Sequence, residues 1–229
     1  MFIHEMFQQK PCVFSVEVFP PKKAGAAEET LYPVLRELCT LGPDYISVTY
    51  GAGGGTAGQS TAKIASYIKN GLHVEALAHL TCVNSTRVQV EETLTRLRED
   101  NVENVLALRG DINPDLPRRM DFLHASDLAK AIAQTGGFGV AGACYPEGHV
   151  ESPSLKADVE SLRYKVEAGV SHLITQLFFD NVSYYRFLNM ARKAGISLPV
   201  QAGIMPIVSK MADRAHRGAQ LRQPAAAVY

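Results

Sequence analysis

The chain has 229 residues, of which 46% are hydrophobic and 20% are charged, a balance typical of a globular protein with a large core. Lys and Arg together number 23, as do Asp and Glu, so no general basic field favours nucleic acid as a partner. No apolar run approaches the roughly 18 residues of a membrane span, so we expect no membrane partner.

The four cysteines, at positions 12, 39, 82 and 144, are far apart and form no CxxC pair. We therefore expect neither a disulfide framework nor a metal site, and a reducing compartment such as the cytoplasm fits best. The N-terminal segment MFIHEMFQQKP lacks a basic stretch followed by an apolar one, so no signal peptide is expected.

Seven apolar runs, each ending in a polar or glycine-rich cluster, predict strands that start near residues 13, 45, 75, 104, 138, 172 and 199. Helix-like stretches follow the first six runs, with clear apolar periodicity at residues 28–41, 86–100, 124–135, 154–168 and 181–194. Ser154, and Ser126 with Asp127, are candidate helix caps. The strand starts are about 27 to 34 residues apart, the size of one βα unit. The pattern predicts a single α/β domain over residues 1–229, a TIM-type (β/α)8 barrel with about seven strands and the eighth unit missing.

Side chains alternate between the two faces of a strand, so each strand indicates which groups face the barrel lumen. On the first strand Glu17 shares a face with Ser15, and on the third His79 shares a face with Leu77. On the fourth we place Arg109 and Asp111 on the face of Val105 and Ala107. Barrel enzymes carry their active sites at the C-terminal strand ends, where we expect these polar groups to converge: Glu17, Thr49, His79, Arg109, Asp111 and Gln176.

Glu17 is the sharpest single signal, because a carboxylate inside an apolar strand is costly to bury without a partner. One interpretation is a structural ion pair with Arg109 or Lys165. The other is a functional group, since a buried carboxyl has a raised pKa and can act as a general acid.

Other candidates carry two interpretations each. Arg109 and Gly110 can approach a phosphate, or can form an ordinary turn with a surface pair. The glycine run at residues 51–55 matches no phosphate-binding motif, which favours a plain loop. His79 fits a buried core histidine better than a ligand, and His149 fits an exposed residue of the loop after the fifth strand.

One helix face carries Asp158, Ser161 and Lys165, spaced three and four residues apart. Such a face is ordinarily solvated, and the residues taken alone give no reason to place it elsewhere.

Eight segments occur in the order of one known family: FSVEVFPPK, YISVTYGAGG, HLTC, LALRGD, HASDL, YPEGH, ITQLFFD and GIMPI. Together they make residues 12 to 208 resemble methylenetetrahydrofolate reductase, a flavoprotein barrel of one-carbon metabolism. The resemblance implies an oxidoreductase of methionine biosynthesis in which NADH or NADPH reduces FAD. The flavin then reduces 5,10-methylenetetrahydrofolate to 5-methyltetrahydrofolate in a ping-pong relay.

The resemblance also implies roles for residues. Glu17 matches the acid that helps to open the folate ring to an iminium cation, and Asp111 matches an aspartate near the flavin and the folate. Gln176 matches a glutamine that binds the pterin. His124 stands where the family commonly has tyrosine. The positions that match the family's FAD site are Thr49, His79, Arg109, Gly110, Asp111, His124, Ala125, Tyr145, His149, Asp158 and Lys165.

Beyond about residue 208 the resemblance ends, and residues 209–229 form a non-matching tail. We therefore expect a barrel that is incomplete at its C-terminus, with its first and last strands unpaired on one side. Unpaired strand edges favour association, so we expect a homo-oligomer. An alternative is an inactive fragment that acts at most as an association module. A third hypothesis is another barrel enzyme, such as a lyase of a phosphorylated substrate.

Overall fold

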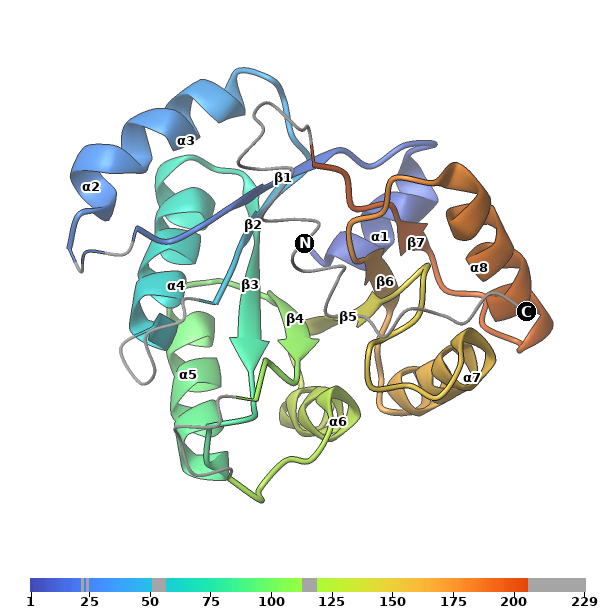
Figure 1. The fold of residues 1–229 in the computed structure, drawn as a ribbon. Helices are drawn as coiled ribbons and strands as arrows, with labels where there is room; N and C mark the ends of the chain where they lie inside the picture. Colours follow the sequence, from blue (N-terminus) through green and yellow to red (C-terminus); the bar gives the residue numbers. More distant parts are fainter. Residues whose placement is uncertain (22, 24, 51–56, 113–118, 206–229) are drawn as a thin grey trace.

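The computed structural model describes residues 1–21, 23, 25–50, 57–112 and 119–205. Its strands form one parallel sheet in sequence order, which curls into most of a barrel with the helices outside (Figure 1). The seven strands are β1 Ser15–Val18, β2 Tyr45–Val48, β3 Glu75–Thr81, β4 Asn104–Leu108, β5 Gly139–Cys144, β6 His172–Thr175 and β7 Val200–Gln201. This confirms an α/β barrel with seven strands in the described part of the chain. The glycine run at 51–55 and the tail at 209–229 lie outside the described residues.

Helices follow the strands as the apolar periodicity predicts, with two refinements. The stretch expected at 28–41 is divided into two helices, and a π-helical turn, η2 Tyr67–Gly71, extends the helix after β2. The helices are α2 Ala27–Thr30, α3 Tyr32–Cys39, α4 Ala57–Ser66, α5 Arg87–Glu99, α6 Ala125–Thr135, α7 Leu155–Glu167 and α8 Asn181–Lys193.

Cap residues explain where several of these helices begin. Ser154 accepts a hydrogen bond from the backbone of Ala157, as expected for the cap of α7. The cap of α6 is His124 rather than Ser126, which lies in the first turn. Asp127 accepts hydrogen bonds from the backbone N–H groups of Leu123 and His124 and so holds this helix start at the barrel mouth.

A helix that the sequence analysis missed, α1 Ile3–Gln9, closes the N-terminal end of the barrel. Its buried Ile3 and Met6 pack in one cluster with inward-facing side chains such as Leu77 and Leu106. The Ile3 N–H donates to the Asn104 side chain at the start of β4. The apolar pairs Phe2–Ile3 and Met6–Phe7, four residues apart, are the helical signal that could have predicted it. The closed end leaves the opposite mouth as the open one.

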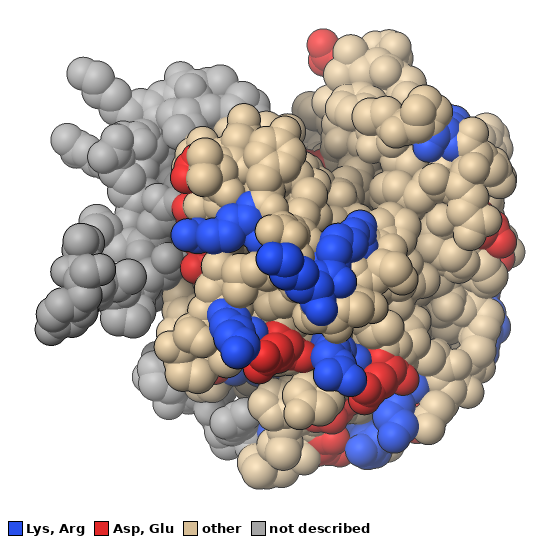
Figure 2. Space-filling model, turned by 90° about the vertical axis from the view of Figure 1, so that its right-hand side faces the viewer, with Lys and Arg blue, Asp and Glu red and all other residues tan. Residues whose placement is uncertain are grey.

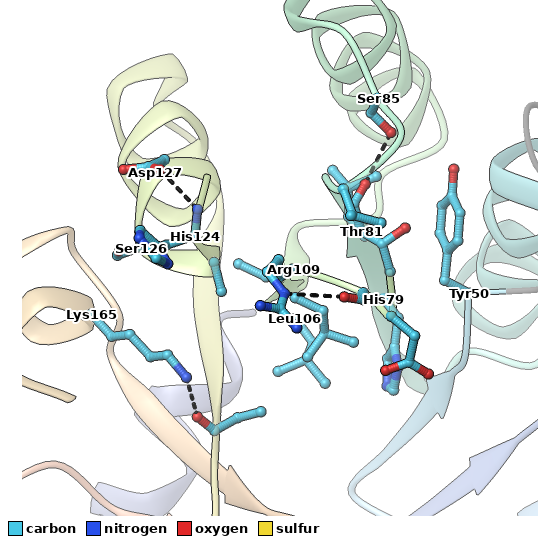
Figure 3. A pocket seen from close by; sticks show the side chains of 18 of the residues that line it. Tyr50, His79, Thr81, Ser85, Leu106, Arg109, His124, Ser126, Asp127 and Lys165 are labelled. Carbon is cyan, nitrogen blue, oxygen red and sulfur yellow. Dashed lines mark hydrogen bonds between the residues drawn. The ribbon is translucent and has the colours of Figure 1, made fainter. Parts of the chain in front are cut away.

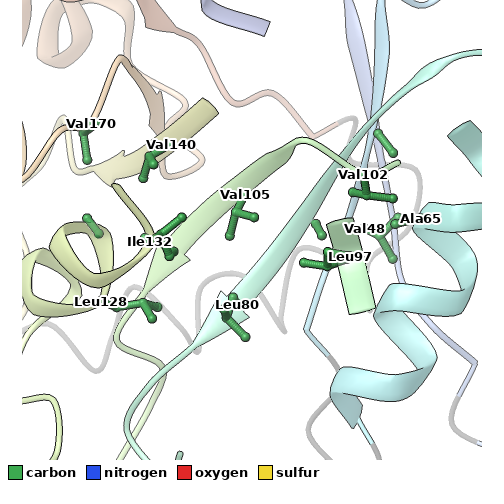
Figure 4. Packing of buried hydrophobic residues seen from close by; sticks show 14 of the residues in the cluster. Val48, Ala65, Leu80, Leu97, Val102, Val105, Leu128, Ile132, Val140 and Val170 are labelled. Atoms are coloured by element: carbon green, nitrogen blue, oxygen red, sulfur yellow. The ribbon is translucent and has the colours of Figure 1, made fainter. Parts of the chain in front are cut away.

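The main core lies between the outer face of the sheet and the helices. Figure 4 shows part of it, in which Val105 and Val140 of the sheet pack with Leu128 and Ile132 of α6. The face predicted for β4 is therefore wrong, because Val105 and Ala107 point at the helices while Leu106 points into the lumen.

Arg109 still reaches the mouth, because it lies beyond the end of β4 and the alternation of the strand does not extend to it. Gly110 follows with φ of +87°, a conformation that favours glycine, and lets the chain turn there.

Candidate active site

A cavity of about 1690 Å³ opens at the C-terminal ends of the strands. Pockets for drug-sized ligands have roughly 300–1,000 Å³, so this one can hold a larger molecule or two molecules together. Every residue that the sequence analysis named for catalysis, cofactor or substrate lines it: Glu17, Thr49, His79, Arg109, Gly110, Asp111, His124, Ala125, Tyr145, His149, Asp158, Lys165 and Gln176. The structure thus brings together residues that six strands and their loops supply.

Glu17 lies on β1 inside this mouth, with a side chain that is 47% exposed. It is less buried than expected, because the cavity is open to solvent. Surrounding protein atoms nevertheless raise the pKa of its carboxyl, an effect that a hydrogen bond with Ser47 partly offsets. The structure shows no ion pair of Glu17 with Arg109 or Lys165, so the structural ion-pair interpretation is not supported. Nε2 of His79 lies 3.5 Å from Oε2 of Glu17.

His79 lies on β3 with only 7% of its surface exposed. Its Nε2 lies 2.7 Å from the Ser47 hydroxyl. Burial lowers the pKa of His79 to about 4, so the ring is neutral near pH 7 and the contact with Glu17 is no ion pair. His79 is therefore both a core histidine and part of the cavity wall (Figure 3).

Arg109 projects into the middle of the cavity in Figure 3. Its guanidinium pairs with Glu151 from the loop after β5. The pair is bidentate, with distances of 2.5 and 2.7 Å, and this hydrogen bonding raises the pKa of Arg109. Gly110 packs closely against Thr81 and Val83, since an added Cβ would lie 3.1 Å from a side-chain carbon of each. A larger residue cannot follow the arginine here.

The face of α7 that carries Asp158 and Lys165 points inward, so the solvated interpretation of this face is wrong. Asp158 is 6% exposed, and its Oδ1 accepts a hydrogen bond from Ser152. Its buried Oδ2 has no hydrogen-bond partner among the described residues. Lys165 reaches the Ala143 carbonyl from α7, as Figure 3 shows, and burial lowers the pKa of its ammonium. A buried acceptor and a buried cation so placed suit a ligand with hydroxyl and anionic groups.

The loop after β5 forms the rim next to α7. Tyr145 stacks edge-on against His149, with ring centroids 4.8 Å apart. Burial raises the pKa of Tyr145 to about 12. On the neighbouring part of the rim, His124 and Ala125 lie at the start of α6. These rings and backbone groups give the cavity flat apolar surfaces between its charged groups.

Asp111 and Gln176 lie at the open end of the cavity, and both side chains are exposed. The negative charge of Asp111 contributes to the raised pKa values of Arg109 and Tyr145, so its field reaches the middle of the site. The backbone N–H of Gln176 donates to the Cys144 carbonyl at 2.7 Å, which fixes this residue at the end of β6.

Sequence reasoning missed two residues of this site. Ser47 pairs with Glu17 in the register of β1 and β2, and the alternation of β2 places it on the lumen face, although it was not predicted as a site residue. Glu151 lies in a loop with no periodicity, so nothing in the sequence marked it as the partner of Arg109. Over the described ranges, no group of three or more His, Cys, Asp or Glu residues could hold a metal ion.

A family model described as methylenetetrahydrofolate reductase matches residues 2–228, nearly the whole chain. The chain belongs to the methylenetetrahydrofolate reductase family. The resemblance drawn from the ordered segments is thereby confirmed, and the match extends beyond residue 208, where we expected it to end.

Curated members of the methylenetetrahydrofolate reductase family match most of the chain. The 5,10-methylenetetrahydrofolate reductase of Pectobacterium carotovorum is 38% identical over 193 residues, which are 84% of this chain and 63% of that protein. The Escherichia coli enzyme of the same name is 36% identical over 84% of this chain and 64% of its own length. Methylenetetrahydrofolate reductase (NADH) 1 of Arabidopsis thaliana is 36% identical over 90% of this chain and 37% of its own length. The chain thus spans less than two thirds of these relatives.

Solved structures of two other proteins share this fold. A structure of oxaloacetate acetylhydrolase aligns with a TM-score of 0.58 at 11% identity, over 99% of this chain and 87% of that one. A structure of 2,3-dimethylmalate lyase aligns with a TM-score of 0.56 at 11% identity, over 97% and 86%. At such identities the likeness shows the barrel architecture alone.

Proposed function

We propose that this member of the family reduces 5,10-methylenetetrahydrofolate to 5-methyltetrahydrofolate with FAD as cofactor and NADH or NADPH as electron donor. The carrying observation is one cavity at the C-terminal strand ends that gathers every residue matched to the family's site around a carboxyl of raised pKa. The name of the Arabidopsis thaliana relative specifies NADH, which makes NADH the first donor to test.

The residues of the cavity fit a flavin dinucleotide. Lys165 and Arg109 can hold its phosphates, and the unpartnered Oδ2 of Asp158 can accept from a ribose hydroxyl. Bound FAD supplies hydride transfer in both directions. The protein supplies orientation, exclusion of water from one side of the cavity, and a placed acid.

Glu17 acts as the acid in this proposal. Its raised pKa keeps a larger share of the carboxyl protonated near neutral pH than an exposed glutamate would have. Giving that proton to the folate favours ring opening to the iminium cation. The negative charge of Asp111 stabilises a cation formed near it, and Gln176 offers an amide to the pterin edge.

We place this enzyme in the cytoplasm, a reducing compartment that suits its four free cysteines. No described helix is both long and apolar enough to cross a membrane. Figure 2 shows acidic and basic side chains beside one another on one face of the protein, in keeping with the equal numbers of both charges.

Glu17→Gln tests the proposal by separating the two halves of the reaction. The variant should reduce FAD with NADH or NADPH at the wild-type rate, because that half needs no acid. It should lose about 10²- to 10⁴-fold in the rate at which folate oxidises the reduced flavin, the usual contribution of a general acid. Stopped-flow absorbance of the flavin measures each half separately.

Glu160→Gln is the matched control, since Glu160 lies on the outer side of α7 with 59% of its side chain exposed. It should behave as wild type in both halves. Equal loss of both halves in Glu17→Gln would sink the acid role. A wild-type chain that shows no flavin spectrum with added FAD would contradict the cofactor.

A further inference from the structure

Ser47 lies between Glu17 and His79, and it is not one of the residues that we matched to the family's site. It sits on β2 directly beside Glu17 of β1 in the strand register, and it is 4% exposed. Its hydroxyl lies 2.7 Å from Nε2 of His79 on β3 and also hydrogen-bonds the Glu17 carboxyl. One small hydroxyl therefore connects side chains from three neighbouring strands.

A hydroxyl has a single proton to donate, so Ser47 cannot donate to both partners at once. When Glu17 is protonated and no folate is bound, its O–H can turn to the Ser47 oxygen, and Ser47 then donates to Nε2 of His79. The neutral imidazole then carries its proton on Nδ1. The direction of both hydrogen bonds is set by the protonation of Glu17.

Loss of the Glu17 proton reverses both bonds. A carboxylate only accepts, so Ser47 rotates and donates to Glu17, and Nε2 of His79 must become the donor to Ser47. The proton that leaves Glu17 goes to the substrate or to water. His79 exchanges a proton on Nδ1 for one on Nε2 through water and stays neutral, so the balance closes without a further reactant.

We propose that Ser47 is a positioning residue for Glu17, which directs the carboxyl into the cavity and couples its protonation to the tautomer of His79. The inference rests on the acid role proposed for Glu17. It adds a residue on which that role depends and a signal that does not require turnover.

The surroundings of Glu17 leave it as the titrating member of this chain. Tyr45 of β2, which feels the charge of Glu17, has its pKa raised to about 12 by burial, and His79 has its pKa lowered to about 4. Farther round the mouth, Arg109 pairs with Glu151, and Lys165 donates to a backbone carbonyl. Asp111 and Tyr145 also line the cavity, just beyond the ends of β4 and β5. Other ionisable groups of its lining are Tyr50 after β2, Glu92 and Arg96 of α5, His124, Asp127 and Lys130 at α6, His149 and Glu151 of the loop after β5, and Asp158, Tyr164 and Glu167 of α7.

Nitrogen-15 NMR of histidine-labelled full-length chain tests the coupling directly. The two ring nitrogens of His79, assigned by their loss in His79→Gln, should exchange donor and acceptor character in one pH step in the wild type. That step should vanish in Ser47→Ala and return in Ser47→Thr, which keeps the hydroxyl. Ser171→Ala, which removes a hydroxyl bonded to the Val140 carbonyl away from the site, should keep it.

The folate half-reaction gives the second readout. Ser47→Ala should slow flavin oxidation by folate about tenfold near pH 7, since a misdirected acid loses part of its usual contribution. The pH–rate profile of the folate half-reaction should fall at a higher pH in Ser47→Ala than in the wild type, because the lost hydrogen bond had lowered the pKa of Glu17. Flavin reduction should be unchanged, and Ser47→Thr should restore the folate rate.

Two results would overturn the inference: a His79 step that persists in Ser47→Ala, or no step in the wild type. If the wild type shows the step but no folate turnover, the proposed function fails while the coupling stands. A step that is lost in Ser47→Ala without a change in the folate rate or its pH profile would reject the positioning role.

Discussion

At the scale of residues, burial decides which histidines can carry charge. His172 begins β6 with 1% of its surface exposed, and neither ring nitrogen has a hydrogen-bond partner among the described residues. Its ring packs against Phe7 of α1 with centroids 5.5 Å apart. Burial, together with the nearby His4, lowers the pKa of His172 to about 4 from an ordinary 6.5. The fold therefore holds this ring neutral where an unfolded chain would protonate it.

This difference predicts a loss of stability in acid. Between pH 6.5 and 4 the unfolded chain binds a proton that folded His172 refuses, so the free energy of unfolding falls as pH falls through this window. His172→Leu removes the effect. From pH 7.5 to 5, its free energy of unfolding should fall by about 2 kcal/mol less than that of the wild type. Urea unfolding at both pH values measures this difference.

His73→Asn is the control, because His73 is exposed and asparagine tolerates its φ of +57°. It should keep the acid sensitivity of the wild type. If the free energy of unfolding of His172→Leu fell by as much between pH 7.5 and 5 as that of the wild type, His172 would be taking up its proton in the folded state as well.

At the scale of elements, the short strand β7 reaches β1 through one side chain. Gln201 donates from Nε2 to the Ser15 hydroxyl at 2.9 Å and to the Val13 carbonyl at 3.4 Å. Its Oε1 accepts from the Tyr45 hydroxyl, which is otherwise enclosed. The amide thus connects both ends of the curled sheet, a task that backbone ladders perform between the other strands. The apolar runs of β1 and β7 predicted both strands, but nothing in the sequence of either run indicated that Gln201 bridges them.

Gln201→Ala should cost about 1–3 kcal/mol of unfolding free energy, because it leaves the buried Tyr45 hydroxyl without its acceptor. Thermal unfolding followed by circular dichroism measures the loss as a lower Tm. The same change at the exposed Gln134 of α6 is the control and should leave Tm nearly unchanged. Equal Tm values for the two variants would mean that the bridge adds nothing to closure.

At the scale of the whole molecule, the described sheet has two ends. Within the described residues, β1 pairs only with β2 and β7 only with β6. Unpaired parallel edges are templates for another chain. Association by itself does not separate the function proposed above from the alternative of an inactive association module, whereas folate turnover by the purified chain does.

We expect the purified chain to associate in a concentration-dependent way through the strand edges that stay unpaired among the described residues. Light scattering after size exclusion at several protein concentrations measures the association. A chain that stays monomeric at all concentrations would contradict this expectation.

The sequence by itself determined the barrel, its seven strands and a set of residues that line one cavity at the strand ends. Period-two apolar runs at regular spacing specify parallel strands, and ordered motifs at their ends specify the mouth, because both signals are local in the chain. The lumen face of β4 and the cap of α6 were predicted wrongly, since strand ends and caps depend on neighbours.

Only the tertiary structure decided which groups pair inside the site. Ser47 connects Glu17 to His79, and Glu151 forms an ion pair with Arg109. These contacts join side chains up to 42 positions apart in the chain. Tertiary packing also gives Glu17 and His79 their shifted pKa values, because desolvation depends on every atom that surrounds a group. A linear pattern shows which residue types are present at the mouth, and the fold sets the distances that make them act together.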